Sequence, residues 1–205
     1  MKYYDIATLK TVIFGAGKAA AGIQAFLEAP EAKGTLLGAW FADVGPLNEV
    51  YILRGYDTEQ DLIEERKRIR LSSDPFNCGD LLVDLHMDSY IPLDFMPAVE
   101  TGEFGPVYEI RTYHTKLNGL APTIEKWREA VPPRTEYSAL TIAMYSLDGG
   151  PRFTQIWPYK SANERAEIRA KTVAEGVWPP KGGPDWLTPN MTSTLAMPMA
   201  FSPLK

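Results

Sequence analysis

The chain consists of two similar halves, and this internal repeat constrains the fold more than any other feature of its 205 residues. The segment YDIAT at 4–8 matches YEIRT at 108–112, an offset of 104 residues. Further strand-like pairs follow at similar offsets, 36–41 with 140–145 and 50–53 with 153–156. These segments are alternating or apolar, as expected for β-strands. Two copies of one structural unit therefore account for most of the sequence.

A helix is predicted after the first strand of each half. In the second half Ile124, Trp127 and Val131 recur at the spacing of one helical face. Ile23 and Phe26 occupy the corresponding places in the first half, at an offset of 101 residues from Ile124 and Trp127. The difference of a few residues from the strand offset indicates that one connecting loop differs in length between the halves.

A second helix and a closing strand complete each half. Thr58 and Ser161 each precede an acid by three residues, a pattern typical of a helix N-terminus. Short apolar segments at 91–95 and 197–201 are expected to be the closing strands, and their prolines indicate edge or terminal positions. The order β-α-β-β-α-β is that of a ferredoxin-like unit. We therefore predict an α+β fold in which each antiparallel sheet carries its helices on one face.

The predicted domains are a first repeat at 1–97, a linker at 98–106 rich in Pro, Gly and Glu, and a second repeat at 107–205. The uncovered face of one sheet needs a partner, which a second copy of the same unit can supply. The two repeats either pair within one chain or exchange partners in a homodimer, and the sequence leaves both arrangements open.

Glycines at the start of the first helix outline a dinucleotide-binding turn, because Gly15 and Gly17 follow the apolar run 12–14. Such a site needs a parallel strand about 20 residues later that ends in an acid for the ribose. Asp43 ends the next predicted strand but lies 28 residues after Gly15, and the matching loop 115–119 lacks the glycine pattern. We interpret the motif as a glycine-rich connection and predict no cofactor.

Composition argues against several classes of partner. The net charge of −5 gives no long-range attraction for phosphate backbones or anionic lipids, so neither nucleic acid nor membrane is an expected partner. No segment reaches the roughly 20 apolar residues of a membrane span, and the N-terminus has no signal-peptide pattern. With Cys78 as the one cysteine, no internal disulfide is possible. The expected location is the cytoplasm.

Several motifs together resemble the NIPSNAP family. The second half opens with YEIRTY at 108–113, ends a strand with WPY at 157–159, and continues with Arg165 and Arg169 in a predicted helix. The first half contains the family-like hairpin GPLN at 45–48. The resemblance covers nearly the whole chain as two copies and implies a dimeric α+β barrel. It implies no particular reaction, because members are described as binding, trafficking or mitochondrial-signalling proteins.

The first half departs from the family pattern more than the second. Ala7, Leu9 and Arg54 stand where the resemblance implies Arg, Tyr and Trp. The family often has His two residues before the Trp, but Ile52 and Gln155 stand there in the two halves. Any binding site is therefore expected mainly in the second half.

Charged and aromatic residues on the strands of the second half are the candidate site residues. Glu109, Arg111 and Tyr113 share one strand face, where Arg111 is expected to line a cavity and meet an anionic or carbonyl ligand. The alternative is a Glu–Arg ladder at a sheet edge or repeat interface. His114 and Glu109 are the candidate acid–base groups. The predicted ligand-binding set is Arg111, Tyr113, His114, Trp157 and Tyr159.

A metal site is not expected. Asp84, His86 and Asp88 alternate as ligands on one strand face would, but also as the solvent face of an edge strand would. A zinc site needs three or four convergent ligands, and no cysteine or second histidine lies nearby.

Three functional hypotheses remain, and whether the chain is an enzyme stays open. The first is binding of a small molecule in a cavity of the α+β barrel. The second is a cofactor-independent oxygenase or isomerase, and the third is an assembly module without a small ligand. We expect a homodimer or higher homo-oligomer.

Overall fold

A computed structural model describes residues 1–205, with only the side chain of Pro184 left out of the description. The order β-α-β-β-α-β occurs twice, as the sequence predicts. The first half contains β1 (Tyr3–Thr11), α1 (Gly15–Leu27), β2 (Thr35–Val44), β3 (Glu49–Tyr56), α2 (Glu59–Leu71) and β4 (Leu82–Pro92). The second half contains β5 (Val107–Thr115), α3 (Leu120–Thr135), β6 (Ile142–Ser146), β7 (Arg152–Tyr159), α4 (Ala162–Ala174) and β8 (Leu187–Pro198).

The eight strands form one closed barrel in the order β1-β3-β2-β8-β5-β7-β6-β4. Every strand pair is antiparallel, and each half contributes a four-stranded ferredoxin-like sheet. Two seams join the halves, where β2 pairs with β8 and β4 pairs with β6. The barrel therefore closes within one chain, which decides between the two arrangements that the sequence left open. The predicted linker 98–106 lies between β4 and β5, and the proposed domain boundaries stay a prediction.

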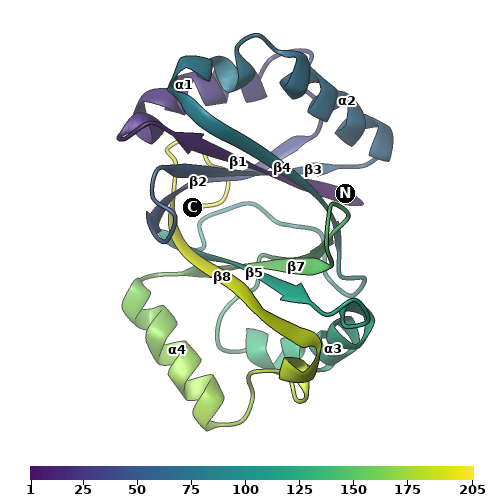
Figure 1. Cartoon of the computed structure of the whole chain (residues 1–205). Coiled ribbons are helices and arrows are strands. Elements are labelled where there is room, and N and C mark those ends of the chain that lie inside the picture. Colours follow the sequence, from purple (N-terminus) through teal and green to yellow (C-terminus); the bar gives the residue numbers. More distant parts are fainter.

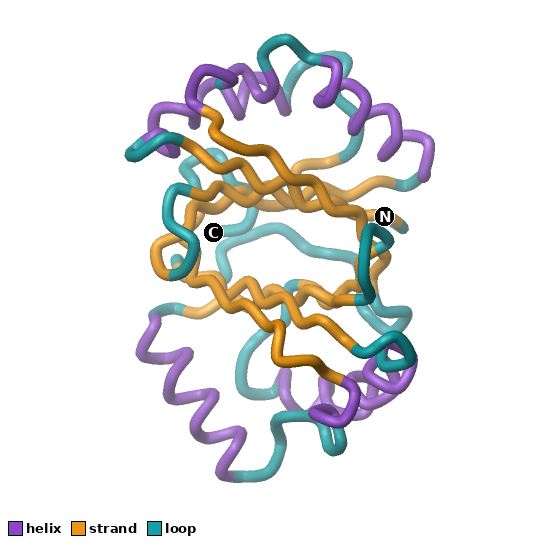
Figure 2. Tube along the Cα trace, in the orientation of Figure 1, coloured by secondary structure: helices purple, strands orange, loops and turns teal.

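The half-sheets face each other, with α1 and α2 outside one and α3 and α4 outside the other (Figures 1 and 2). Three apolar clusters follow from this layering: one between the sheets and one beneath each pair of helices. Because side chains alternate between the two faces of a strand, one strand contributes residues to two clusters. On β1, Tyr4 and Ile6 pack between the sheets, whereas Ala7 and Leu9 pack beneath the helices.

The closing strands begin earlier than the sequence predicted. β4 spans Leu82–Pro92 and β8 spans Leu187–Pro198, whereas the apolar segments that we expected to form them start at 91 and 197. Polar residues interrupt the first part of each strand, so neither strand forms a continuous apolar run that the sequence would reveal. β4 pairs with β1 from Leu82 to Tyr90 but with β6 only from Tyr90 to Pro92. Its first part therefore has a neighbour on one side only, and its proline lies at the strand end, as predicted.

The predicted helix starts are confirmed. Thr58 Oγ1 accepts a hydrogen bond of 3.1 Å from the backbone N–H of Asp61, and Ser161 Oγ caps Glu164 at the same distance. None of the helices described here combines the length and apolar character of a membrane-spanning segment.

The glycine-rich connection of the first half leads into α1, which begins at Gly15. β3 lies between β1 and β2, so the motif belongs to a split β-α-β unit. Farther along α1, a Cβ at Gly22 would lie 2.2 Å from the carbonyl oxygen of Asn77. The small residue at this position lets the helix pack closely against the 3₁₀ turn Pro75–Asn77.

Candidate functional site

The helix-covered side of the second half-sheet carries four of the five predicted ligand-binding residues. Trp157 and Tyr159 of β7 pack into the cluster beneath α3 and α4, and Tyr113 of β5 packs against it. Arg111 lies on the same face of β5, because side chains alternate along a strand. His114 has the opposite parity, which it shares with Tyr108 and Ile110 in the cluster between the sheets. The predicted set is thus divided between two faces and does not line one common cavity.

Glu109 of β5 is fully buried at the centre of a basic cluster. Its Oε1 atom accepts hydrogen bonds from Arg111, from Arg165 of α4 and, at 2.7 Å, from Ser193 of β8. Arg169 Nη1 lies 3.8 Å from Oε2. Burial alone would raise the pKa of Glu109, but the hydrogen bond from Arg165 and the charge of Arg111 outweigh it and lower the pKa to about 2. The carboxylate is therefore ionised at neutral pH.

Arg134 of α3 adds a fourth guanidinium beside this cluster. Arg134 is only 2% exposed and donates hydrogen bonds to Ser138 Oγ at 2.8 Å and to the Tyr159 hydroxyl at 3.3 Å. Its Cζ atom lies 4.5 Å from the ring centroid of Trp157. No carboxylate of the described side chains forms an ion pair with it. Burial lowers the pKa of Arg134, as expected for a cation without an acidic partner. We call Glu109, Arg111, Arg134, Arg165 and Arg169 the arginine cluster.

The corresponding place in the first half holds a charge-balanced network. Arg54 Nε donates to Asp5 Oδ1 at 2.9 Å, and Arg54 Nη1 donates to Glu65 Oε1 at 2.8 Å. Arg68 Nη2 lies 2.7 Å from the same Glu65 oxygen. Burial opposes the charge of Arg54, but the neighbouring Asp5 outweighs it and raises the pKa of Arg54. Two acids therefore match two bases in this half.

Substitutions between the two repeats explain the difference in charge. Asp5 corresponds to Glu109, so one buried acid is present in each half. Glu65 of α2 corresponds to Ile168 of α4, and Leu62 corresponds to Arg165, both at an offset of 103 residues. At these two positions the second half has an apolar residue where the first half has an acid, and a base where the first half has an apolar residue.

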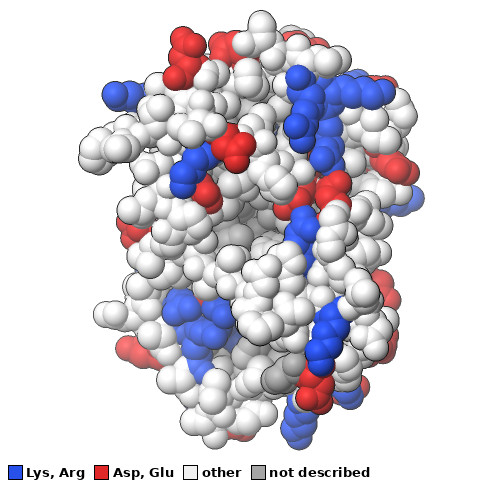
Figure 3. Space-filling model, in the orientation of Figure 1, with Lys and Arg blue, Asp and Glu red and all other residues white. Residues whose placement is uncertain are grey.

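A cavity of about 200 Å³ is lined by Tyr113, which Arg111 of the arginine cluster contacts. Its walls are mainly aromatic and apolar, with Tyr113, Trp127, Trp178, Leu187 and Met191 among the lining residues, and Thr123 and Lys126 of α3 also line it. Trp178 packs edge to face against Trp127, with ring centroids 4.9 Å apart. The Tyr113 hydroxyl accepts a hydrogen bond from Arg111 Nε, which connects the cavity to the cluster. Basic side chains gather between β8 and α4 on the face shown in Figure 3.

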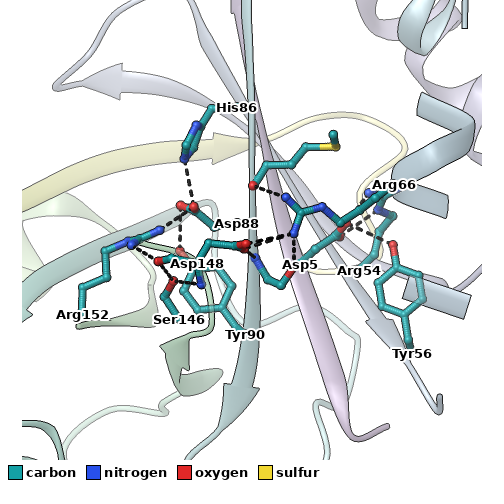
Figure 4. Close-up of polar contacts among 12 residues, drawn as sticks. Asp5, Arg54, Tyr56, Arg66, His86, Asp88, Tyr90, Ser146, Asp148 and Arg152 are labelled. Carbon is teal, nitrogen blue, oxygen red and sulfur yellow. Dashed lines mark hydrogen bonds and ion pairs between the residues drawn. The ribbon is translucent and has the colours of Figure 1, made fainter. Parts of the chain in front are cut away.

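A second polar network lies where β4 meets the second half (Figure 4). His86 Nε2 lies 2.9 Å from Asp88 Oδ1, and Asp88 forms an ion pair with Arg152 of β7. Arg66 of α2 lies 3.1 Å from Asp148 in the turn between β6 and β7. The ion pairs Asp88–Arg152 and Arg66–Asp148 both join one half to the other, so this network stabilises the junction at which β4 pairs with β6. Among the described side chains, no three His, Cys, Asp or Glu groups converge to hold a metal ion.

Several buried polar residues were not anticipated from the sequence, notably Asp5, Arg54 and Arg134. One available signal was the acid shared by the two repeats, because Asp5 and Glu109 occupy the same place on the first strand. An acid at a strand position flanked by apolar residues indicates a buried partner. Arg134 carries no such signal, because it follows two prolines near the end of α3.

Comparison with known proteins gives a family and a fold. The family model described as NIPSNAP matches residues 4–76 and 108–203. An anthrone oxidase-like protein shares the fold with a TM-score of 0.70 and 9% identity, over 97% of this chain and 91% of the other. A "putative monooxygenase" from Lactobacillus acidophilus NCFM has a TM-score of 0.66 and 10% sequence identity, over 97% of this chain and 94% of the other. An uncharacterized NIPSNAP domain protein from Burkholderia xenovorans has a TM-score of 0.42 and 20% sequence identity, over 46% of this chain and 96% of the other. No curated protein sequence matches the chain.

Proposed function

The chain belongs to the NIPSNAP family, and we propose that it binds a small molecule between its second half-sheet, helix α3 and the segment 178–183 that follows α4. The cavity of about 200 Å³ walled by Tyr113, Trp127 and Trp178 carries this proposal. An apolar cavity of roughly 150 Å³ suffices to hold benzene. The size and lining therefore fit one aromatic ring or two fused rings.

The space between the two half-sheets supports a ligand less well. The sequence-based hypothesis placed the ligand in the barrel, but large buried side chains such as Tyr4, Trp40, Tyr90 and Tyr108 pack there. The rings of Trp40 and Tyr108 have centroids 5.1 Å apart. A ligand would have to displace this packing, whereas the cavity beside Trp178 is already formed.

Tryptophan fluorescence tests the proposal, because two tryptophans line the cavity. We expect the neutral probe 2-naphthamide to change the emission in a saturable way. Met191 lines the cavity, so the larger side chain of Met191→Trp should fill the space and abolish binding. Because Met191 is 43% exposed, the fold should tolerate this substitution. Met191→Leu is the matched control, because it keeps the volume and should keep binding. Equal binding by both variants would refute this location.

A cofactor-independent oxygenase or isomerase acting in the same cavity is the second candidate. Its support is the fold shared over nearly the whole chain with an anthrone oxidase-like protein, at an identity that concerns the fold alone. Oxygen uptake in the presence of an anthrone tests it. Uptake that Met191→Trp removes would favour an enzyme. Uptake no faster than in buffer would count against an oxygenase acting on anthrones.

An assembly role rests on a different surface. An open groove of about 700 Å³ runs beside β8, with Phe41, Phe104 and Met197 among its lining residues. Because the barrel closes within one chain, a homo-oligomer would use outer surfaces such as this groove. Native mass spectrometry of the protein and of Phe104→Asp tests the expected homo-oligomer. An oligomer that Phe104→Asp dissociates would favour the groove as the interface.

A further inference from the structure

Deepening the proposed function on which it rests, we propose that the ligand is an aromatic molecule carrying an oxyanion group, a carboxylate or phosphate, and that the arginine cluster binds this group. Three guanidiniums of the cluster, those of Arg111, Arg165 and Arg169, form ion pairs with one carboxylate, that of Glu109, and Arg134 beside them has no acidic partner among the described side chains. Unpaired positive charge in a partly buried place is costly. A bound oxyanion would supply the negative charge that Glu65 supplies in the first half.

Hydrogen-bonding groups in the cluster are left unused. Glu109 Oε2 and Arg165 Nε are buried and have no hydrogen-bond partner among the described atoms. The separation of 3.8 Å between Arg169 and Glu109 is too long for a hydrogen bond. Buried polar atoms are nearly always satisfied in folded proteins. Arg165 Nε and Arg169 are therefore donors that a further oxygen acceptor can bind, whereas Glu109 Oε2 is an acceptor that still needs a donor.

An entering group can reach the cluster from solvent. The side chains of Arg165 and Arg169 are 23% and 33% exposed, and that of Arg111 is 13% exposed. Glu109 beneath them is fully buried. The arginines thus form the accessible side of the cluster, which favours an incoming anion over a cation.

The cavity and the cluster are close enough for one small ligand to occupy both. Arg111 and Tyr113 are two residues apart on one face of β5, a spacing of about 7 Å along a strand. Their partners on β8 are Ser193 and Met191, so the same two steps recur on the neighbouring strand. A naphthalene-sized ring beside Tyr113 and Met191 would place a substituent near Arg111 and Ser193. Guanidiniums suit such a substituent, since they bind carboxylates and phosphates in a planar, two-point geometry.

Three probes of one ring system test the inference: 2-naphthoate, 2-naphthyl phosphate and neutral 2-naphthamide, titrated at constant ionic strength. Charge-assisted hydrogen bonds predict that at least one anion binds about tenfold or more tightly than the amide. The preferred anion identifies the oxyanion class. The double variant R165Q/R169Q should lower the affinity for the anion several-fold, towards that for the amide, because only Arg111 and Arg134 of the cluster remain. It should leave the affinity for the amide unchanged.

Arg70→Gln is the matched control, because Arg70 is an exposed arginine on α2, the helix that corresponds to α4. Its affinity for every probe should equal that of the wild type. Arg169→Lys, which keeps the charge, should retain the preference for the anion and shows that the site survives substitution. If the amide binds as tightly as both anions, the inference fails and the proposed function stands. If no probe binds, both fail.

Discussion

Replacing Glu109 by glutamine removes the one acid of the arginine cluster while keeping the size of the side chain. The pKa of Glu109 is lowered from its ordinary 4.5 to about 2. At roughly 1.4 kcal/mol per unit, this shift corresponds to about 3 kcal/mol of folding free energy. Because the folded-state pKa is the lower one, this stability is present above pH 4.5 and is lost as the pH falls towards 2. Glu109→Gln lacks it at every pH.

Urea unfolding followed by tryptophan fluorescence measures this difference. At pH 7 we expect Glu109→Gln to be less stable than the wild type by about 3 kcal/mol, and the gap should narrow between pH 4.5 and 2. Other acids titrate in both proteins, so their effects cancel in the comparison. Glu167→Gln changes an exposed acid of α4 and should alter stability by no more than about 0.5 kcal/mol. A Glu109→Gln protein as stable as the wild type at pH 7, or a gap that persists unchanged to pH 3, would refute the reasoning.

Two further predictions concern the first half. Arg54→Ala leaves Asp5 and Glu65 buried without their shared base, so we expect a loss of about 3–5 kcal/mol in urea unfolding; a loss below 1 kcal/mol would show that the network is not a buried charge pair. Gly22→Ala places a Cβ 2.2 Å from a backbone oxygen and should cost about 1–3 kcal/mol. Gly17→Ala meets nothing within 4 Å and should leave stability unchanged or raise it by up to about 1 kcal/mol; equal melting temperatures for the two variants would contradict this account.

Alternation along β5 predicts that Glu109, Arg111 and Tyr113 share one strand face, and Arg111 donates hydrogen bonds to both of the others. It did not reveal whether that face meets the helices or the barrel interior, because both environments are covered and both accept large side chains. The predicted ligand-binding set contained both Tyr113 and its sequence neighbour His114. Adjacent side chains of a strand point to opposite faces, so these two residues do not share one face. The Glu–Arg contact that we named as an alternative is present, but on the helix-covered face.

Order and caps of the elements follow from the sequence alone, because strand alternation, helical spacing and capping depend on residues within a few positions of each other. The repeat extended this local information to the fold class. Closure within one chain depends on contacts such as Asp88–Arg152, which join residues 64 positions apart. The surplus of positive charge depends likewise on Glu109 meeting Arg165 across 56 positions. The first pairing arises only when the halves pack together, and the second only when α4 packs on the second half-sheet, so the tertiary structure decided where the candidate site lies.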